Sequence, residues 1–282
     1  MITQTAKPRL NRLIRIVAIG AAIALALWLV LCLLLFGAQD KLLFYPKKLS
    51  IEAFAQAGDP PGVDTVELAM ADGTVVRGWL VNNEEKESNL LIYYGGNAEE
   101  VSRLIARMGE LEGWAIVLMN YRGYGASDGT AGETTMCSDA LEIYDHFTRM
   151  DDYSNGKVVV MGRSIGTGVA AYVASQRSVS SVILVSPYDS MTSVVQEMIP
   201  FVPVNLILRH KFNTIERAPG ITAPLLILTG SEDTTIPVWH SKLVADHWGG
   251  DMKMVEIEGD HNSMSRQEEY WEEIGNFLTG SD

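Results

Sequence analysis

The chain has 282 residues, an apolar content of 47% and a formal net charge of −13, which suit one large α/β domain with a short appendage. The first 36 residues carry four cations and no acidic residue, so the remainder holds 18 basic and 35 acidic residues, a net charge of −17. This negative charge argues against nucleic acid as a partner. Of the two cysteines only Cys137 lies outside the apolar N-terminal region, which excludes an internal disulfide in the domain and a zinc site built on thiolates.

The N-terminal region predicts a membrane anchor. Residues 1–15 form a basic tail, and residues 16–36 are an uncharged apolar run of 21 residues, long enough to cross a bilayer as a helix. A cleaved signal peptide has a shorter apolar region and a small-residue cleavage site, which Phe36-Gly37-Ala38 does not provide. We therefore expect an uncleaved anchor that associates the protein with a membrane.

Two further regions follow the anchor. We expect a juxtamembrane segment at residues 37–61 and the main domain at residues 62–282. The basic tail favours a cytoplasmic N-terminus and hence an extracytoplasmic domain. The charge difference across the anchor is small, because three lysines follow it closely: Lys41, Lys47 and Lys48.

The rest of the chain alternates between strand and helix patterns. Residues 63–70 and 74–81 flank an Asp-Gly turn and predict an antiparallel hairpin, followed by a polar loop at 82–89. Continuous apolar runs, typical of strands buried on both faces of a parallel sheet, lie at 90–94, 115–119, 157–161, 181–185, 225–228 and 252–257. Helical patterns lie at 98–111, 134–150, 165–175, 237–247 and 264–278. The alternation predicts an α/β fold with a mostly parallel, doubly wound sheet, whose functional crevice lies at the carboxyl ends of the strands.

A candidate nucleophile stands at one of these strand ends. The sequence Gly-Arg-Ser-Ile-Gly at residues 162–166 joins a strand pattern to a helix pattern. In such a turn the serine hydroxyl is exposed to a base and a substrate carbonyl, and the glycines allow close packing of strand and helix. We interpret Ser164 as a nucleophile; a tight turn without chemistry is the alternative.

A serine hydroxyl needs a base, usually an imidazole that a carboxylate orients. His261 follows the predicted strand at 252–257, and Asp233 follows the one at 225–228. The order Ser164, Asp233, His261 is the chain order expected of a serine hydrolase on this fold. Asp189 is the reserve candidate for the acid. The other histidines are expected to be surface or packing residues: His146, His210, His240 and His247.

The reaction also needs donors for a developing oxyanion. The backbone N–H of Ile165 is one candidate, because it begins a helix and has no intrahelical acceptor. The N–H of Asn97 is the second, in the loop Gly95-Gly96-Asn97-Ala98 after the strand at 90–94. No cofactor and no metal are expected.

These residues together resemble the α/β-hydrolase superfamily, especially its small membrane-anchored esterases and protein depalmitoylases, over about residues 42–278. The matching motifs are Phe44-Tyr45-Pro46, Gly95-Gly96-Asn97-Ala98, Asn120-Tyr121-Arg122-Gly123-Tyr124-Gly125-Ala126-Ser127, the serine motif, Ser186-Pro187, the Gly-x-x-Asp-x-x-x-Pro segment at 230–237 and Gly259-Asp260-His261-Asn262. The resemblance implies hydrolysis of carboxylic esters or thioesters, on a small acyl ester or lipid-like substrate. The family usually has a histidine in place of Gly95, which braces the oxyanion loop, so its absence is expected to loosen the loop or widen the site.

Other interpretations stay open. A catalytically impaired hydrolase fold used for binding is compatible with Gly95, and a serine peptidase could use the same residues. A nucleotide-binding fingerprint at 166–171 is disfavoured, because four residues separate it from the strand. No large lid is expected. For the apolar stretch at 186–224 we favour one or two helices packed on the sheet over a small cap that accepts an acyl chain or contacts a bilayer.

Overall fold

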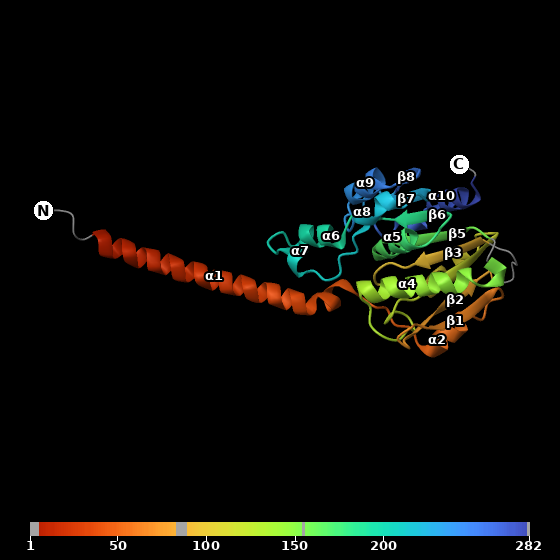
Figure 1. The fold of residues 1–282 in the computed structure, drawn as a ribbon, viewed down its shortest axis with the longest axis horizontal. Helices are drawn as coiled ribbons and strands as arrows, with labels where there is room; N and C mark the ends of the chain where they lie inside the picture. Colours follow the sequence, from red (N-terminus) through yellow and green to blue (C-terminus); the bar gives the residue numbers. More distant parts are fainter. Residues whose placement is uncertain (1–5, 83–88, 154–155, 281–282) are drawn as a thin grey trace.

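The structure is a computed structural model that describes residues 6–82, 89–153 and 156–280. The polar loop predicted at 82–89 lies, apart from its two ends, outside the described residues. The described chain forms an eight-stranded sheet with helices on both faces, and a long N-terminal helix projects from one end of this domain (Figure 1).

The projecting helix is α1, Ala6–Leu43. It runs without a break from the predicted basic tail through the predicted anchor into the predicted juxtamembrane segment. Among the described residues, one helix is long and apolar enough to cross a membrane; it comprises Asn11–Leu43 of α1, and its most apolar window has a mean hydropathy of 2.8. Only 6% of its most apolar window is buried against the rest of the chain. A long helix of this kind in water would expose its whole apolar surface.

The sheet has the predicted composition of one antiparallel hairpin and a parallel remainder. Its strands are β1 (Val63–Ala69), β2 (Val75–Val81), β3 (Asn89–Tyr94), β4 (Trp114–Met119), β5 (Val158–Arg163), β6 (Ser181–Val185), β7 (Leu225–Gly230) and β8 (Met252–Ile257). Their order is β1-β2-β4-β3-β5-β6-β7-β8. Strand β2 is antiparallel to β1 and β4, and all other pairs are parallel. The predicted fold class is confirmed.

The helices cover the two faces of the sheet. One face carries α4 (Glu133–Thr148), α5 (Ile165–Gln176) and α9 (Val238–His247), and the other carries α2 (Ile51–Gln56), α3 (Ile105–Met108) and α10 (Glu268–Thr279). Successive strand residues serve opposite faces, so Leu90 belongs to the first core and Leu91 to the second.

Two predicted helices are shorter than expected. The helix predicted at 98–111 consists of a 3₁₀ turn at Val101–Leu104 followed by α3, since Ala98 has a positive φ of 56° and cannot continue a helix. The helix predicted at 264–278 begins with a 3₁₀ turn at Met264–Arg266, and α10 starts at Glu268.

The segment after α1 is attached to the domain. Phe44 is buried in the core that includes Tyr124. Lys48 forms a parallel bridge with Gly125, in which the Gly125 N–H donates to the Lys47 carbonyl at 2.7 Å and the Leu49 N–H donates to the Gly125 carbonyl at 3.0 Å. The end of α1 is thereby fixed beside the carboxyl edge of the sheet.

The apolar stretch at 186–224 forms α6 (Met191–Met198), α7 (Val204–Ile207) and α8 (Thr214–Arg217). Val194 of α6 reaches the main core, as expected of a helix that packs on the sheet. Residues Val202, Val204 and Leu208 instead form a separate cluster with Cys32 of α1. Figure 1 shows α6 and α7 at the end of the domain from which α1 projects.

Candidate active site

Ser164 occupies a strained turn between β5 and α5. Its φ of 51° and ψ of −120° are rare for a residue other than glycine. A Cβ on Gly162 would lie 2.3 Å from the carbonyl oxygen of Gly166, and a Cβ on Gly166 would lie 2.1 Å from that of Tyr94. Only glycine permits these approaches. This strained strand-to-helix elbow presents the serine hydroxyl at the carboxyl edge of the sheet, as the predicted role of Ser164 requires.

Asp233 and His261 lie in hydrogen-bonding contact. Asp233 follows β7 and His261 follows β8, the neighbouring strand, so parallel pairing brings the two loops to the same edge. The His261 Nδ1 lies 2.7 Å from the Asp233 Oδ2. Because a carboxylate only accepts, Nδ1 carries a proton, and Nε2 is the unprotonated nitrogen whenever the ring is neutral.

The carboxylate of Asp233 is fully surrounded by donors. Its Oδ1 accepts the N–H groups of Thr235 at 2.9 Å and Ile236 at 2.8 Å, and its Oδ2 also accepts the Ser186 hydroxyl at 2.8 Å. Burial raises the pKa of Asp233, but the hydrogen bonds from His261, Ile236 and Ser186 outweigh it and hold the pKa below its ordinary value. The group is therefore an ionised acceptor with a fixed orientation.

Arg163 ties the loop of His261 to the turn of Ser164. Its Nη2 donates to the His261 carbonyl at 2.9 Å and to the Asn262 Oδ1 at 2.9 Å. The structure thus gathers the three predicted residues at one edge. Within the described residues, the Ser164 hydroxyl and the His261 Nε2 are not hydrogen-bonded to each other or to another group.

The two predicted oxyanion donors are unpaired at this edge. Neither the N–H of Asn97 nor that of Ile165 donates a hydrogen bond to a described residue. The side chain of Asn97 has a different role. Its Nδ2 donates to the Leu43 carbonyl at 2.6 Å, and its Oδ1 accepts the Tyr45 N–H at 2.9 Å and the Tyr124 hydroxyl at 2.7 Å. The oxyanion loop is therefore attached directly to the end of α1.

The loop around Gly95 is braced without the histidine that the resemblance leads one to expect there. The Tyr121 hydroxyl donates to the Gly95 carbonyl at 2.9 Å. The Gly96 N–H donates to the Glu99 Oε2 at 2.5 Å, and the same oxygen accepts the Tyr93 hydroxyl at 2.9 Å. These hydrogen bonds hold the loop in place on the side that faces the sheet. They can substitute for the bracing contact that the expected histidine would make.

A second aspartate–histidine pair lies away from Ser164. The reserve candidate Asp189 contacts His240 of α9, with 2.5 Å between its Oδ1 and the ring Nδ1. His240 has no exposed surface, and its Nε2 is buried without a hydrogen bond, 3.6 Å from the Glu197 Oε2. Asp189 is therefore not a partner of His261.

A cleft of about 290 Å³ lies beside the oxyanion loop. It is lined by polar side chains that include Lys47, Arg103, Glu99 and Asn262. Over the part of the chain that the structure describes, no group of three or more His, Cys, Asp or Glu side chains is arranged to hold a metal ion.

Comparisons with known proteins match this architecture. A family model described as the alpha/beta hydrolase fold matches residues 89–207. An esterase of Pyrococcus furiosus, Pf2001, superposes with a TM-score of 0.65 at 16% identity, over 84% of this chain and 96% of that one.

The chain has the α/β-hydrolase fold.

Curated relatives extend the similarity over most of the sequence. An uncharacterized protein of Mycobacterium tuberculosis is 27% identical over 83% of each chain. An uncharacterized membrane protein of Saccharomyces cerevisiae is 28% identical, over 86% of this chain and 90% of that one. These relatives share the α/β-hydrolase region and, by the coverage, part of what precedes it.

Three groups around the site were not predicted: Glu99, Arg163 and the hydroxyl of Ser186. Each carried a sequence signal. Arg163 stands inside the serine motif, Glu99 follows the oxyanion loop, and Ser186 begins the loop after β6, the strand next to that of Asp233. In an α/β-hydrolase fold all three positions lie at the functional edge.

Proposed function

We propose that this protein is a membrane-anchored serine hydrolase that cleaves carboxylic ester or thioester bonds through an acyl-enzyme intermediate. The observation that carries the proposal is the Asp233–His261 contact at the same sheet edge as Ser164, a serine in a strained elbow. A neutral imidazole with its Nδ1 bonded to a carboxylate has the tautomer that a general base requires.

In the first step the Ser164 Oγ attacks the carbonyl carbon while the His261 Nε2 takes its proton. The Asp233 carboxylate stabilises the resulting imidazolium, and the N–H groups of Asn97 and Ile165 donate to the oxyanion. The imidazolium then protonates the departing alcohol or thiol, leaving the acyl group on Ser164. The bond between Ser164 and His261 is expected to form when substrate binds, because catalytic hydrogen bonds are often absent without it.

Water completes the cycle. The His261 Nε2 takes a proton from a water molecule that attacks the acyl-enzyme, and the proton returns to the Ser164 Oγ as the carboxylic acid leaves. Each oxyanion donor is expected to contribute about 10²–10³ in turnover. The polar cleft beside Asn97 suits the leaving group, since Lys47, Arg103 and Asn262 can pair with its polar atoms.

Helix α1 is proposed to be the anchor, with the domain on the extracytoplasmic side. The length and hydropathy of Asn11–Leu43 support a span, and the yeast relative is named as a membrane protein. A protein held in this way meets acyl substrates at the bilayer surface, so we propose a small acyl ester or a lipid-like molecule as substrate.

A fluorophosphonate probe tests the proposal. The full chain in detergent is expected to be labelled, Ser164→Ala is expected to lose all labelling, and Ser138→Ala, which changes an exposed serine of α4, is expected to keep it. The alternative is a catalytically impaired α/β-hydrolase fold that binds ligands, which Gly95 in place of the usual histidine leaves open. Absence of labelling in the folded wild-type protein would contradict the proposed hydrolase and favour that alternative.

A further inference from the structure

Residues 198–208, here named the apolar loop, are uncharged over eleven positions and read Met-Ile-Pro-Phe-Val-Pro-Val-Asn-Leu-Ile-Leu. Three of its side chains are among the most exposed apolar groups outside α1: Met198 at 76%, Phe201 at 85% and Leu206 at 82%. Large apolar groups gathered on one surface element mark an interaction site. The question is what covers them.

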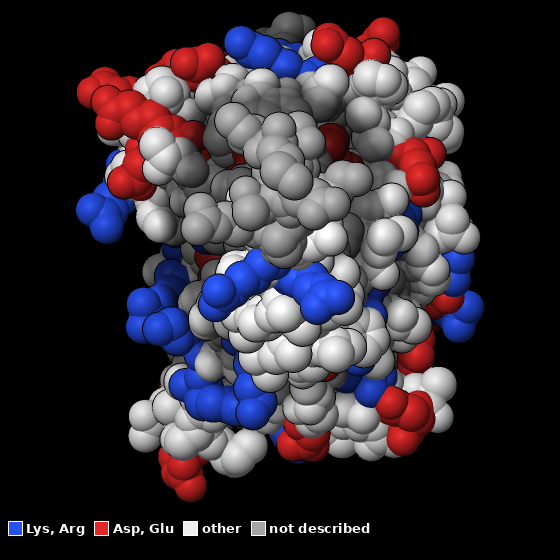
Figure 2. Space-filling model, turned by 90° about the vertical axis from the view of Figure 1, so that its left-hand side faces the viewer, with Lys and Arg blue, Asp and Glu red and all other residues white. Residues whose placement is uncertain are grey.

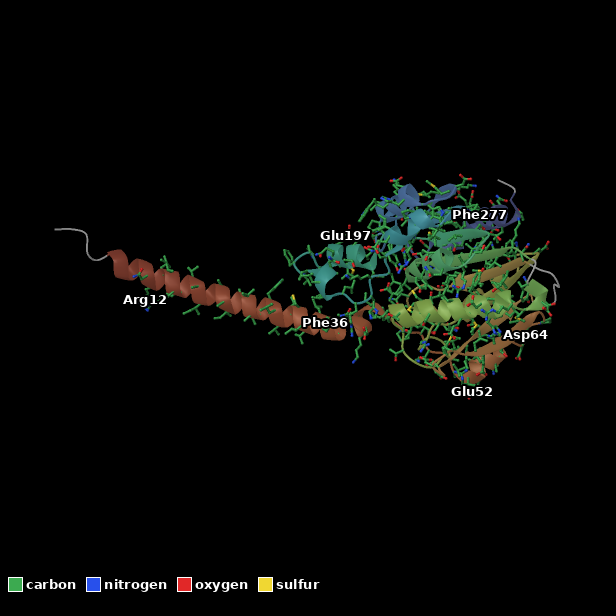
Figure 3. The ribbon with its side chains drawn as sticks, viewed as in Figure 1. Arg12, Phe36, Glu52, Asp64, Glu197 and Phe277 are labelled. Carbon is green, nitrogen blue, oxygen red and sulfur yellow. The ribbon has the colours of Figure 1, made fainter. Side chains whose placement is uncertain are left out.

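The loop lies against the apolar part of α1. Its inner side chains pack with Cys32, and the Trp28 Nε1 donates to the Phe201 carbonyl at 2.8 Å. Trp28 precedes Phe36, the last residue of the apolar run, by eight positions, which is about 12 Å along a helix. Figure 3 shows Phe36 on the part of α1 that lies nearest the domain. It also shows Glu197, the residue next to the loop, at the end of the domain from which α1 projects. The loop therefore extends beside the apolar run itself.

Two glutamine side chains of the protein donate hydrogen bonds to backbone carbonyls of the loop. The Gln196 Nε2 donates to the carbonyls of Ile199 and Val202 at 3.4 and 3.0 Å. The Gln39 Nε2 donates to that of Ile207 at 3.3 Å. Two loop residues are prolines, which have no N–H to satisfy. Water can bond the backbone of an exposed loop, whereas backbone at membrane depth must obtain its hydrogen bonds from the protein.

Charged groups begin where the apolar run of α1 ends. Asp40 of α1 accepts hydrogen bonds from the Arg209 Nη2 at 2.9 Å and contacts the His210 Nε2 at 2.8 Å. The loop and α1 thus change from apolar to charged at the same level. Figure 2 views the molecule from the side on which α1 projects, so α1 points toward the viewer and its side chains overlie those of the domain behind it. A shared level of this kind is what a membrane surface imposes on two adjacent elements.

We propose that the apolar loop is inserted into the bilayer beside α1, so that the lipid acyl region covers Met198, Phe201 and Leu206. The proposal rests on the proposed anchoring of α1 and is independent of the chemistry at Ser164. The domain is then held at the membrane by two elements. The carboxyl edge of its sheet, where Asn97 binds the end of α1, faces the lipid.

Site-specific fluorescence tests the insertion. The full chain, with Cys32→Ala and Cys137→Ala, is reconstituted into phosphatidylcholine vesicles and labelled with an environment-sensitive dye at Phe201→Cys or Leu206→Cys. Leu33→Cys on α1 serves as the lipid reference, and Met252→Cys, an exposed apolar position on β8, serves as the aqueous reference. Two loop positions are used so that a folding defect in one leaves the other as a readout.

Doxyl-labelled lipids are expected to quench both loop labels at least fivefold more strongly than the Met252→Cys label. Aqueous iodide is expected to quench both loop labels at least fivefold less strongly than the Met252→Cys label. Iodide quenching of both loop labels equal to that of Met252→Cys, with Leu33→Cys quenched by lipid, would overturn the insertion and leave the anchor intact. Protection from iodide without lipid quenching would overturn it in favour of a protein partner or second copy. Loss of lipid quenching at Leu33→Cys would overturn both the anchor and the insertion.

Discussion

Two aspartate–histidine pairs occupy this fold, and they differ in what surrounds the second ring nitrogen. Asp233–His261 and Asp189–His240 have short contacts of 2.7 and 2.5 Å through Nδ1, and in both the aspartate pKa lies below its ordinary value. The Nε2 of His240 is buried without a hydrogen bond. Among the described residues, the Nε2 of His261 is not enclosed in this way. An oriented imidazole alone is therefore a poor indicator of a site.

The neighbours of each pair explain the difference. His261 stands beside the elbow of Ser164 and is tied to it by Arg163. His240 joins α9, to which it belongs, to the loop that leads into α6, and the adjacent Ser241 hydroxyl donates to the Pro187 carbonyl at 3.0 Å. The second pair thus joins α9 to the loop before α6, while the first lies at the sheet edge that carries Ser164.

The largest expected difference between the two pairs comes from replacing the histidine of each. His261→Ala is expected to lower kcat on a p-nitrophenyl ester by about 10⁴-fold or more, because the proposed general base is lost. His240→Ala is expected to change kcat by less than about tenfold while lowering the melting temperature, because the pair it removes is structural. Equal inactivation by His240→Ala, with circular dichroism unchanged, would contradict this assignment.

The next effect separates the two carboxylates. Asp233→Asn is expected to reduce kcat about 10³–10⁴-fold, since an amide at this position can favour the wrong tautomer of His261. Asp189→Asn is expected to leave kcat within about tenfold and to reduce the free energy of unfolding by about 1.5–3 kcal/mol, the usual contribution of a hydrogen bond to a charged group. Activity assays and thermal denaturation of the full chain in detergent measure both quantities. A larger loss of kcat in Asp189→Asn would reverse the roles.

A smaller effect concerns the surroundings of the first pair. Asn97→Ala keeps the backbone N–H but removes the bonds to Leu43, Tyr45 and Tyr124, so we expect kcat to fall about tenfold, less than the ~10²–10³ of a lost oxyanion donor. Asn82→Ala is the matched control, because its amide bonds to the carbonyls of Gly109 and Trp114 lie on another edge. A fall of more than about 10³-fold in Asn97→Ala would assign the side chain itself to the reaction.

The smallest effect is the pH dependence of stability. The pKa of Asp189 is raised by burial but lowered more by its bonds with His240 and Ser190, so it lies below its ordinary value of about 3.9 in the folded state. A lowered folded-state pKa stabilises the protein above the ordinary value, and this contribution disappears as the pH falls through the folded value. The difference in unfolding free energy between wild type and Asp189→Asn is therefore expected to be constant near neutral pH and to shrink below about pH 4. A difference that grows on acidification would contradict the lowered pKa.

Sequence reasoning was strongest where local patterns and fold rules agree. The buried strand runs and the Asp-Gly hairpin determined the fold class, because a parallel sheet needs continuous apolar strands. The same rule placed Ser164, Asp233 and His261 at one edge, and their roles remain predictions. Contacts between distant segments have no local pattern. The attachment of Asn97 to Leu43 joins residues 54 positions apart, and the pairing of Asp189 with His240 joins residues 51 positions apart. The packing of α7 on α1, rather than on the sheet, likewise depends on the path of the whole chain.

The attachment of Asn97 to the end of α1 has a practical consequence for work on a shortened protein. Deleting the N-terminal helix is the obvious route to a water-soluble form, and residue 62 is where the predicted domain starts. A chain that begins there lacks Phe44 from its core and lacks the Leu43 carbonyl and Tyr45 N–H that hold Asn97. Weak activity in such a fragment would reflect the loss of these contacts to Asn97 and not the activity of the full chain. A chain starting before Gln39 keeps the Leu43 and Tyr45 contacts to Asn97, together with the contacts of Gln39 and Asp40 to Arg209.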